Sequence, residues 1–216
     1  MTKRKLPETN KALVVGAVAD PAALKLEPEN CDIIELRLDS LGYGEEILSY
    51  AQKCKFPLLV TARGPEEGGQ NHLDISERKT SYEALIPYAA AIDIELRSFQ
   101  ELTSIIEQAK ENNVLVVGSF HDFEKTPPLK DLENKIGEIA DIHKFATYIE
   151  TAEDLAIHRQ LLKKYDQLSV MGMGPLGAEA RPEMMKIGSL LNYGYLGDTP
   201  TAPNQWPVAK LKNLGL

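Results

Sequence analysis

Eight short apolar segments recur along the chain, and helical patterns lie between most of them. Apolar runs of this length, bounded by turn residues, are typical of buried strands. Strands that alternate with helices form a parallel sheet, so the fold is either a (β/α)8 barrel or a doubly wound sheet. The expected strands are Ala12–Val18, Asp32–Leu38, Pro57–Ala62, Ala90–Leu96, Val114–His121, Ala140–Ala146, Leu168–Met173 and Leu191–Leu196.

Amphipathic spacing predicts the helices. Thr151 and Asp154 form a capping box ahead of an apolar run, and Pro182 suits the first turn of a helix that runs to about Leu190. No G-x-G-x-x-G follows the first expected strand, which argues against a dinucleotide-binding sheet. The other expected helices are Gly44–Lys53, Ser76–Ala89, Phe99–Asn112, Leu129–Ile139 and Thr151–Tyr165.

Length and charge narrow the class of protein. A chain of 216 residues without a linker or composition break is expected to form one domain, residues 1–216. Its net charge is −8 and it has no lysine- or arginine-rich run, so nucleic acid is not an expected partner. No stretch is apolar enough to span a membrane, and the basic start (residues 1–5) lacks the apolar run of a signal peptide. We therefore expect a cytoplasmic protein.

Lys144 interrupts one of the apolar strands. A lysine is almost never fully buried unless it is paired or has a function. Burial favours its neutral amine, which can attack a carbonyl to form a Schiff base. The alternative is an exposed strand end with the lysine in water. Four histidines show no ligand spacing, so we expect no metal site.

Polar residues at the ends of other strands bear on this choice. Strand side chains alternate between two faces, and a barrel places its chemistry at the carboxyl ends of its strands. If the polar faces all point inward, one cavity receives charged or polar side chains from five strands. They are Glu35, Arg37, Arg63, Asp93, Glu95, His121 and Lys144.

The types of residue in this cavity indicate its chemistry. Two arginines suit an anionic or polyhydroxylated small molecule through forked hydrogen bonds. A histidine beside a neutral lysine places a proton acceptor next to an imine-forming amine. No phosphate-binding glycine loop is present, so the expected anion is a carboxylate. Met171, Met173, Tyr193 and Tyr195 are expected to fill the barrel.

These segments resemble one family, type I 3-dehydroquinate dehydratase, from about Leu13 to Trp206. Each motif is short, but seven occur in the same order at the expected strand ends. They are Glu35-Leu36-Arg37-Leu38-Asp39; Thr61-Ala62-Arg63 with Glu67-Gly68-Gly69; Asp93-Ile94-Glu95-Leu96; Ser119-Phe120-His121-Asp122-Phe123 with Thr126-Pro127; Lys144-Phe145-Ala146; Met173-Gly174 with Gly177 and Arg181; and Thr201-Ala202-Pro203-Asn204-Gln205.

The resemblance implies a (β/α)8 barrel that is usually a homodimer, needs no metal or organic cofactor, and performs the third step of the shikimate pathway towards aromatic amino acids. It implies that Lys144 forms the imine, His121 is the acid/base group and Glu67 orients it. It also implies that Arg181 binds the substrate carboxylate. Glu35, Arg37 and Arg63 would bind the substrate hydroxyls, and Thr201 and Gln205 would contact substrate from a closing loop.

The chain departs from the family pattern at three positions. Ala180 precedes Arg181 where serine is usual, and the loop has Thr201 and Asn204 where serine and glycine are usual. Asp93 and Glu95 are as able to support the arginines as to touch substrate. Two other functions stay open, a class I aldolase-like Schiff-base lyase and a non-catalytic binding barrel.

Overall fold

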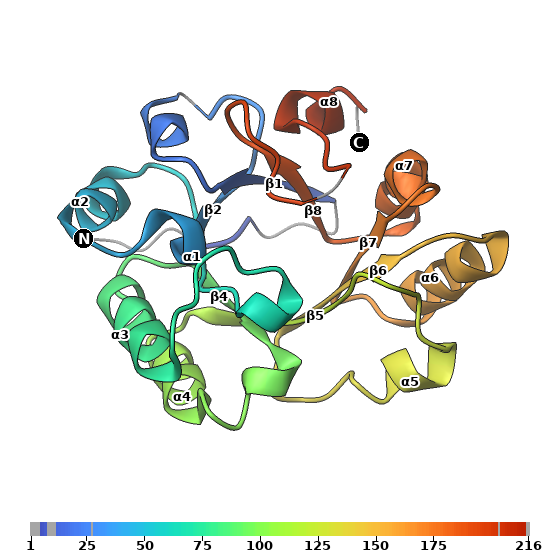
Figure 1. The fold of residues 1–216 in the computed structure, drawn as a ribbon, viewed down its shortest axis with the longest axis horizontal. Coiled ribbons are helices and arrows are strands. Elements are labelled where there is room, and N and C mark those ends of the chain that lie inside the picture. Colours follow the sequence, from blue (N-terminus) through green and yellow to red (C-terminus); the bar gives the residue numbers. More distant parts are fainter. Residues whose placement is uncertain (1–4, 8–11, 27, 203, 215–216) are drawn as a thin grey trace.

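The eight expected strands form one parallel sheet, in the order β7-β6-β5-β4-β3-β2-β1-β8. The computed structural model describes residues 5–7, 12–26, 28–202 and 204–214, so most of the basic start and Pro203 of the predicted loop lie outside the described residues. The sheet curls into a nearly closed (β/α)8 barrel (Figure 1). Its strands are β1 (Leu13–Val18), β2 (Ile33–Arg37), β3 (Leu58–Thr61), β4 (Ala91–Glu95), β5 (Leu115–Asp122), β6 (Ile142–Tyr148), β7 (Leu168–Met173) and β8 (Leu191–Tyr195).

Strands β7 and β8 close the ring through serine side chains. The Leu191 amide donates to Ser169 Oγ at 2.8 Å, and the Val170 amide donates to Ser189 Oγ at 3.1 Å. One backbone bond, from the Leu190 amide to the Leu168 carbonyl, adds to them. Hydroxyl groups therefore satisfy amides that a backbone ladder would otherwise pair.

The helices surround the strands, with α2 to α4 on one side of the ring and α5 to α7 on the other (Figure 1). Three short 3₁₀ turns, Pro21–Lys25, Pro65–Glu67 and Leu96–Ser98, lie in the connections. The helices are α1 (Leu38–Leu41), α2 (Glu45–Lys53), α3 (Ile75–Leu85), α4 (Thr103–Glu111), α5 (Leu129–Glu133), α6 (Ala152–Lys164), α7 (Gly177–Ile187) and α8 (Val208–Lys212).

The prediction for the start of α7 was wrong. The helix begins at Gly177, five residues before Pro182, which lies inside it. Gly177 packs directly on Gly172 of β7, where a Cβ on Gly177 would lie 2.3 Å from the Gly172 carbonyl carbon. This close approach fixes where the helix leaves the strand. Pro182 has no N–H, so one helical hydrogen bond is lost there.

Three other helices are at least three residues shorter than expected. Helix α3 ends at Leu85, before the expected Ala89. Helix α5 ends at Glu133, and the Gly137 amide beyond it donates to Nε2 of His143 on β6. The segment 99–102 precedes α4, because a 3₁₀ turn follows β4 directly. The expected capping box of Thr151 and Asp154 is confirmed at the start of α6.

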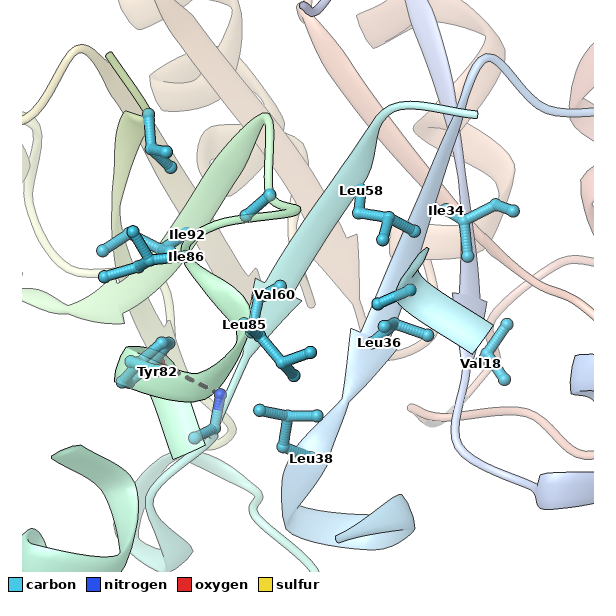
Figure 2. Packing of buried hydrophobic residues seen from close by; sticks show 14 of the residues in the cluster. Val18, Ile34, Leu36, Leu38, Leu58, Val60, Tyr82, Leu85, Ile86 and Ile92 are labelled. Carbon is cyan, nitrogen blue, oxygen red and sulfur yellow. Dashed lines mark hydrogen bonds between the residues drawn. The ribbon is translucent and has the colours of Figure 1, made fainter. Parts of the chain in front are cut away.

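Apolar side chains form separate cores inside and outside the ring. Ile33 and Leu59 point into the barrel, whereas Ile34, Leu36 and Leu58 pack against the helices (Figure 2). This alternation confirms the inward face predicted for Glu35 and Arg37. Among the described residues, no helix is both long enough and apolar enough to cross a membrane.

Candidate active site

A cavity of about 220 Å³ opens at the carboxyl ends of the strands, and all nine site residues named from the sequence line it. Its size suits one small molecule. The nine are Glu35, Arg37, Arg63, Glu67, His121, Lys144, Arg181, Thr201 and Gln205; Gly68, Phe123, Ala146, Met171, Met173, Tyr193 and Ala202 also line the cavity.

Lys144 is buried on the inward face of β6, with 5% of its surface exposed. Its Nζ donates to Asp93 Oδ2 at 2.9 Å and lies 4.0 Å from the centre of the Tyr193 ring. The strand continues to Tyr148, so Lys144 is not at an exposed strand end. The amine therefore contacts an anion, which the sequence-based prediction did not include.

Asp93 and Glu95 do not line the cavity; they lie behind it and hold the arginines. Arg63 donates to Asp93 Oδ1 at 2.9 Å and to Ser119 Oγ at 2.6 Å, and contacts Glu95 at 3.2 Å. Glu95 is also paired with Arg78. This answers the question that the sequence left open, since both acids support basic groups.

The charges around Asp93 govern its ionisation. Burial alone would raise the pKa of its carboxyl, but Arg63 and Lys144 bring that pKa well below its usual range. Asp93 is therefore an anion at neutral pH. A buried carboxylate with three donors is a fixed charge and not a proton carrier.

His121 and Glu67 form a pair at the mouth. His121 Nδ1 lies 2.9 Å from Glu67 Oε2, which also accepts the backbone N–H of His121. Burial lowers the pKa of His121 well below its ordinary value, and Arg63 and Lys144 act in the same direction. Burial raises the pKa of Glu67 to about 7. With Glu67 ionised and Nδ1–H donating to it, Nε2 of a neutral imidazole is free to accept a proton.

The loop that carries Glu67 depends on glycine at two positions. Gly68 has φ +88°, in the left-handed region. A Cβ on Gly69 would lie 2.2 Å from the carbonyl oxygen of Arg63, so no side chain fits there. The pair Gly68-Gly69 thus lets the chain fold back on the end of β3 and bring Glu67 to His121.

Asp39 organises the mouth and has no role in the sequence-based prediction. Its carboxylate accepts two hydrogen bonds from Arg37, at 2.9 and 2.8 Å, and others from the backbone N–H groups of Arg63 and Gln70. The arginines lower its pKa although burial opposes them. The signal was present in the sequence as an acid two residues after Arg37, just past a strand end.

Arg181 is the cavity arginine without a protein anion. It is 8% exposed, and NH1 donates to the backbone carbonyl of Tyr193 at 2.8 Å. Its Nε is buried without a hydrogen-bond partner, and among the described residues no carboxylate lies within ion-pair distance. Burial lowers the pKa of Arg181 to about 10. A guanidinium in this state is open to an anionic ligand.

The loop after β8 reaches over the cavity. Gln205 Oε1 accepts both the backbone N–H of Thr201, at 2.7 Å, and the Thr201 hydroxyl, at 2.8 Å. Asn204 has φ +56°, a conformation that asparagine tolerates and glycine adopts freely. The loop is therefore tied to itself through the two residues that were expected to contact substrate.

Aromatic residues of the cavity were not predicted as part of the site. Phe123 is stacked on His121 and is 41% exposed at the mouth. Tyr193 was expected only to fill the barrel, yet it lies beside Lys144 in the cavity. Within the described part of the chain, no cluster of three or more His, Cys, Asp or Glu side chains is arranged to hold a metal ion.

Comparison with known proteins identifies similar sequences and folds. A family model described as type I 3-dehydroquinase matches residues 18–214. A 3-dehydroquinate dehydratase from Thermodesulfovibrio yellowstonii is 34% identical over 191 residues, covering 84% of this chain and 83% of that protein. One from Methanococcus maripaludis strain C5 is 34% identical over 195 residues, covering 85% and 86%.

Solved structures of enzymes with this name have the same fold. A 3-dehydroquinate dehydratase from Aquifex aeolicus VF5 superposes with a TM-score of 0.77 at 28% identity, covering 94% of this chain and 96% of that one. One from Geobacillus kaustophilus HTA426 gives a TM-score of 0.81 at 24% identity, covering 94% and 90%. The second likeness concerns the fold alone.

Proposed function

Because this chain belongs to the type I 3-dehydroquinase family, we propose that it removes water from 3-dehydroquinate, giving 3-dehydroshikimate, through an imine on Lys144. The relatives above are named for this hydro-lyase reaction. One observation carries the proposal: a buried primary amine and a buried arginine without a protein anion line the same small cavity. They match the ketone and the carboxylate of this substrate.

Arg181 would hold the substrate by its carboxylate. The guanidinium is already desolvated and lacks a counter-ion in the protein, so a carboxylate supplies the missing charge through forked hydrogen bonds. Glu35, Arg37 and Arg63 line the cavity around it and would contact the ring hydroxyls. This fixes which carbon of the ring reaches Lys144.

Lys144 would attack the C3 ketone as the neutral amine. His121 would first take one proton from the Lys144 ammonium. The nitrogen lone pair then forms a C–N bond while the C=O π pair moves to oxygen, which takes a proton from that nitrogen. The proton that His121 holds lets this oxygen leave as water, and an iminium results. The positive nitrogen withdraws electrons from C2 and makes its proton acidic. Covalent catalysis is needed because a proton beside a simple ketone is too weakly acidic for a histidine.

His121 would take the C2 proton on Nε2, since Glu67 holds Nδ1. The C–H electron pair becomes the enamine double bond. The enamine then expels the C1 hydroxyl, which leaves as water with the proton that His121 acquired. Hydrolysis of the product imine returns Lys144 to its amine. The step belongs to the shikimate pathway in this proposal.

The test is borohydride reduction during turnover of 3-dehydroquinate. We expect the reduced ligand on the Lys144 peptide, and no product absorbance from Lys144→Ala. Lys125→Ala is the matched control, because Lys125 is an exposed lysine near the mouth, and it should behave as wild type. A carbon–carbon cleavage product would instead support the aldolase-like alternative. Binding without turnover or adduct would support a binding barrel.

A further inference from the structure

The hydroxyl of Tyr193 is a second buried polar group of the cavity that lacks a partner. Its oxygen is buried without a hydrogen-bond partner among the described residues, although the side chain lines the cavity. Buried polar groups in native proteins are nearly always hydrogen-bonded, and an exception calls for a ligand or a water. Arg181 Nε is the other such atom in this cavity, and its ligand is the proposed carboxylate.

Tyr193 belongs to a ring of side chains from the even-numbered strands. Glu35 on β2, Asp93 on β4, Lys144 on β6 and Tyr193 on β8 all point inward, and alternate strands of a barrel fill one layer in this way. Asp93 contacts Lys144 at 2.9 Å, and Lys144 Nζ lies 4.0 Å from the Tyr193 ring centre. The amine therefore lies over the face of the Tyr193 ring, which carries the hydroxyl at its edge.

The acids of this layer do not accept the Tyr193 hydrogen bond. The Asp93 carboxylate accepts hydrogen bonds from Arg63, Ser119 and Lys144. Glu35 Oε1 accepts one from the Thr61 hydroxyl. Burial raises the pKa of Tyr193 well above its ordinary value, and the charges of Asp93 and Glu35 raise it further. The phenol therefore keeps its proton, so the hydroxyl can act only as a hydrogen-bond donor or acceptor.

Resting on the function proposed above, we propose that the Tyr193 hydroxyl donates a hydrogen bond to the ketone oxygen of the substrate while Lys144 adds to the ketone carbon. That oxygen and Nζ are bonded to the same carbon during the addition, so a donor beside Nζ is within its reach. As the C–N bond forms, the C=O π pair moves onto oxygen, where a fixed donor stabilises the charge. The oxygen then takes the proton that nitrogen loses.

The backbone of Tyr193 supports this position. Its carbonyl accepts the hydrogen bond from Arg181 NH1 at 2.8 Å, so the carboxylate anchor and the phenol are held by one residue. A substrate bound through Arg181 therefore meets the hydroxyl at a defined distance. Orientation of this kind favours the addition over binding alone.

The test compares Tyr193→Phe with wild type in rapid-quench borohydride trapping. Phenylalanine keeps the ring and removes only the hydroxyl. We expect the rate of adduct formation on Lys144 to fall roughly 10²- to 10³-fold, as for loss of one oxyanion donor. The melting temperature should stay the same or rise, because the variant lacks the unpaired hydroxyl. Tyr195→Phe is the matched control, from the same strand but outside the cavity lining.

Each outcome has one meaning. A wild-type rate in Tyr193→Phe would overturn the role of the hydroxyl. A lower melting temperature in that variant would also overturn it, since the hydroxyl would then have a partner within the protein. If wild type itself forms no adduct on Lys144, the proposed function fails. If wild type forms the adduct and Tyr193→Phe matches its rate, only the inference about Tyr193 fails.

Discussion

Lys144 Nζ and Asp93 Oδ2 lie 2.9 Å apart, and both side chains are almost wholly buried. The same carboxylate binds Arg63 through its other oxygen. One acid thus joins the proposed imine-forming lysine to a cavity arginine. The lysine is held in place before any ligand arrives, which fits a group that has to meet a ketone at a defined position.

Replacing Asp93 by asparagine should destabilise the fold by roughly 3–5 kcal/mol, because two buried cations lose a shared anion. Since the pKa of Asp93 is depressed in the fold, this stabilisation is present above the pKa of an unfolded aspartate and is lost as pH falls further. The difference in the free energy of unfolding between wild type and Asp93→Asn should therefore narrow below about pH 4. Urea unfolding at several pH values measures it. Glu183→Gln, on an exposed pair with Arg159, is the control and should change little.

On the acid side, kcat/KM should decrease with an apparent pKa near 7, and this titration should belong to the Glu67–His121 pair. The active form has an ionised carboxylate and a neutral imidazole, and burial raises the pKa of Glu67 to about 7. Activity is therefore lost as pH drops through about 7, when a proton enters the pair. Glu67→Gln removes the titrating carboxyl, so its limb should move to lower pH, towards the depressed pKa of His121. An unmoved limb in the variant would place this titration on another group.

Arg181→Gln should lower kcat/KM by roughly 10²-fold, mainly through KM, because a forked hydrogen bond to the carboxylate is lost. Stability should not fall with it, since the guanidinium is buried without a counter-ion. Steady-state kinetics and thermal unfolding check the two halves. Arg159→Gln, on the surface of α6, should leave kinetics unchanged. Loss of stability without a change in KM would make Arg181 a structural residue.

Gln205→Ala should raise KM more than it lowers kcat. The amide of Gln205 accepts two hydrogen bonds from Thr201, so its loss loosens the loop that covers the cavity. Kinetics and limited proteolysis with and without ligand check this. Equal cleavage with and without ligand, together with unchanged kinetics, would show that the loop is a plain connector.

Asn204→Gly should leave the free energy of unfolding nearly unchanged, whereas Asn204→Ala should lower it by about 1–2 kcal/mol. The reason is that this position has φ +56°, which alanine adopts poorly.

The sequence contained enough information for the ring and for its inward faces. All eight strands begin and end within two residues of the expected bounds, because short apolar runs report burial directly. Helix limits were less predictable. The start of α7 depends on Gly177 packing on Gly172 across the turn after β7, a contact that amphipathic spacing does not encode.

The cavity lining followed from strand alternation and from the family resemblance, but its supporting contacts did not. Asp39 contacts the nearby Arg37, but it also accepts the Arg63 amide 24 residues away, and Asp93 accepts Lys144 Nζ 51 residues away. Only the folded ring brings these distant partners together. The unpaired state of Arg181 and Tyr193 is likewise a property of their surroundings. The homodimer, the cytoplasmic location and the single-domain boundary stay predictions.

The joint between β7 and β8 should be more sensitive to side-chain substitution than the other joints of the ring. Seven joints are held by ladders of backbone hydrogen bonds, which survive almost any exchange of side chain. The eighth has the backbone bond from Leu190 to Leu168 and otherwise depends on the hydroxyls of Ser169 and Ser189. Arg181 follows β7 and Tyr193 lies on β8, so the two stand on either side of this joint. Replacing either serine therefore weakens the joint between the two strands next to these cavity residues.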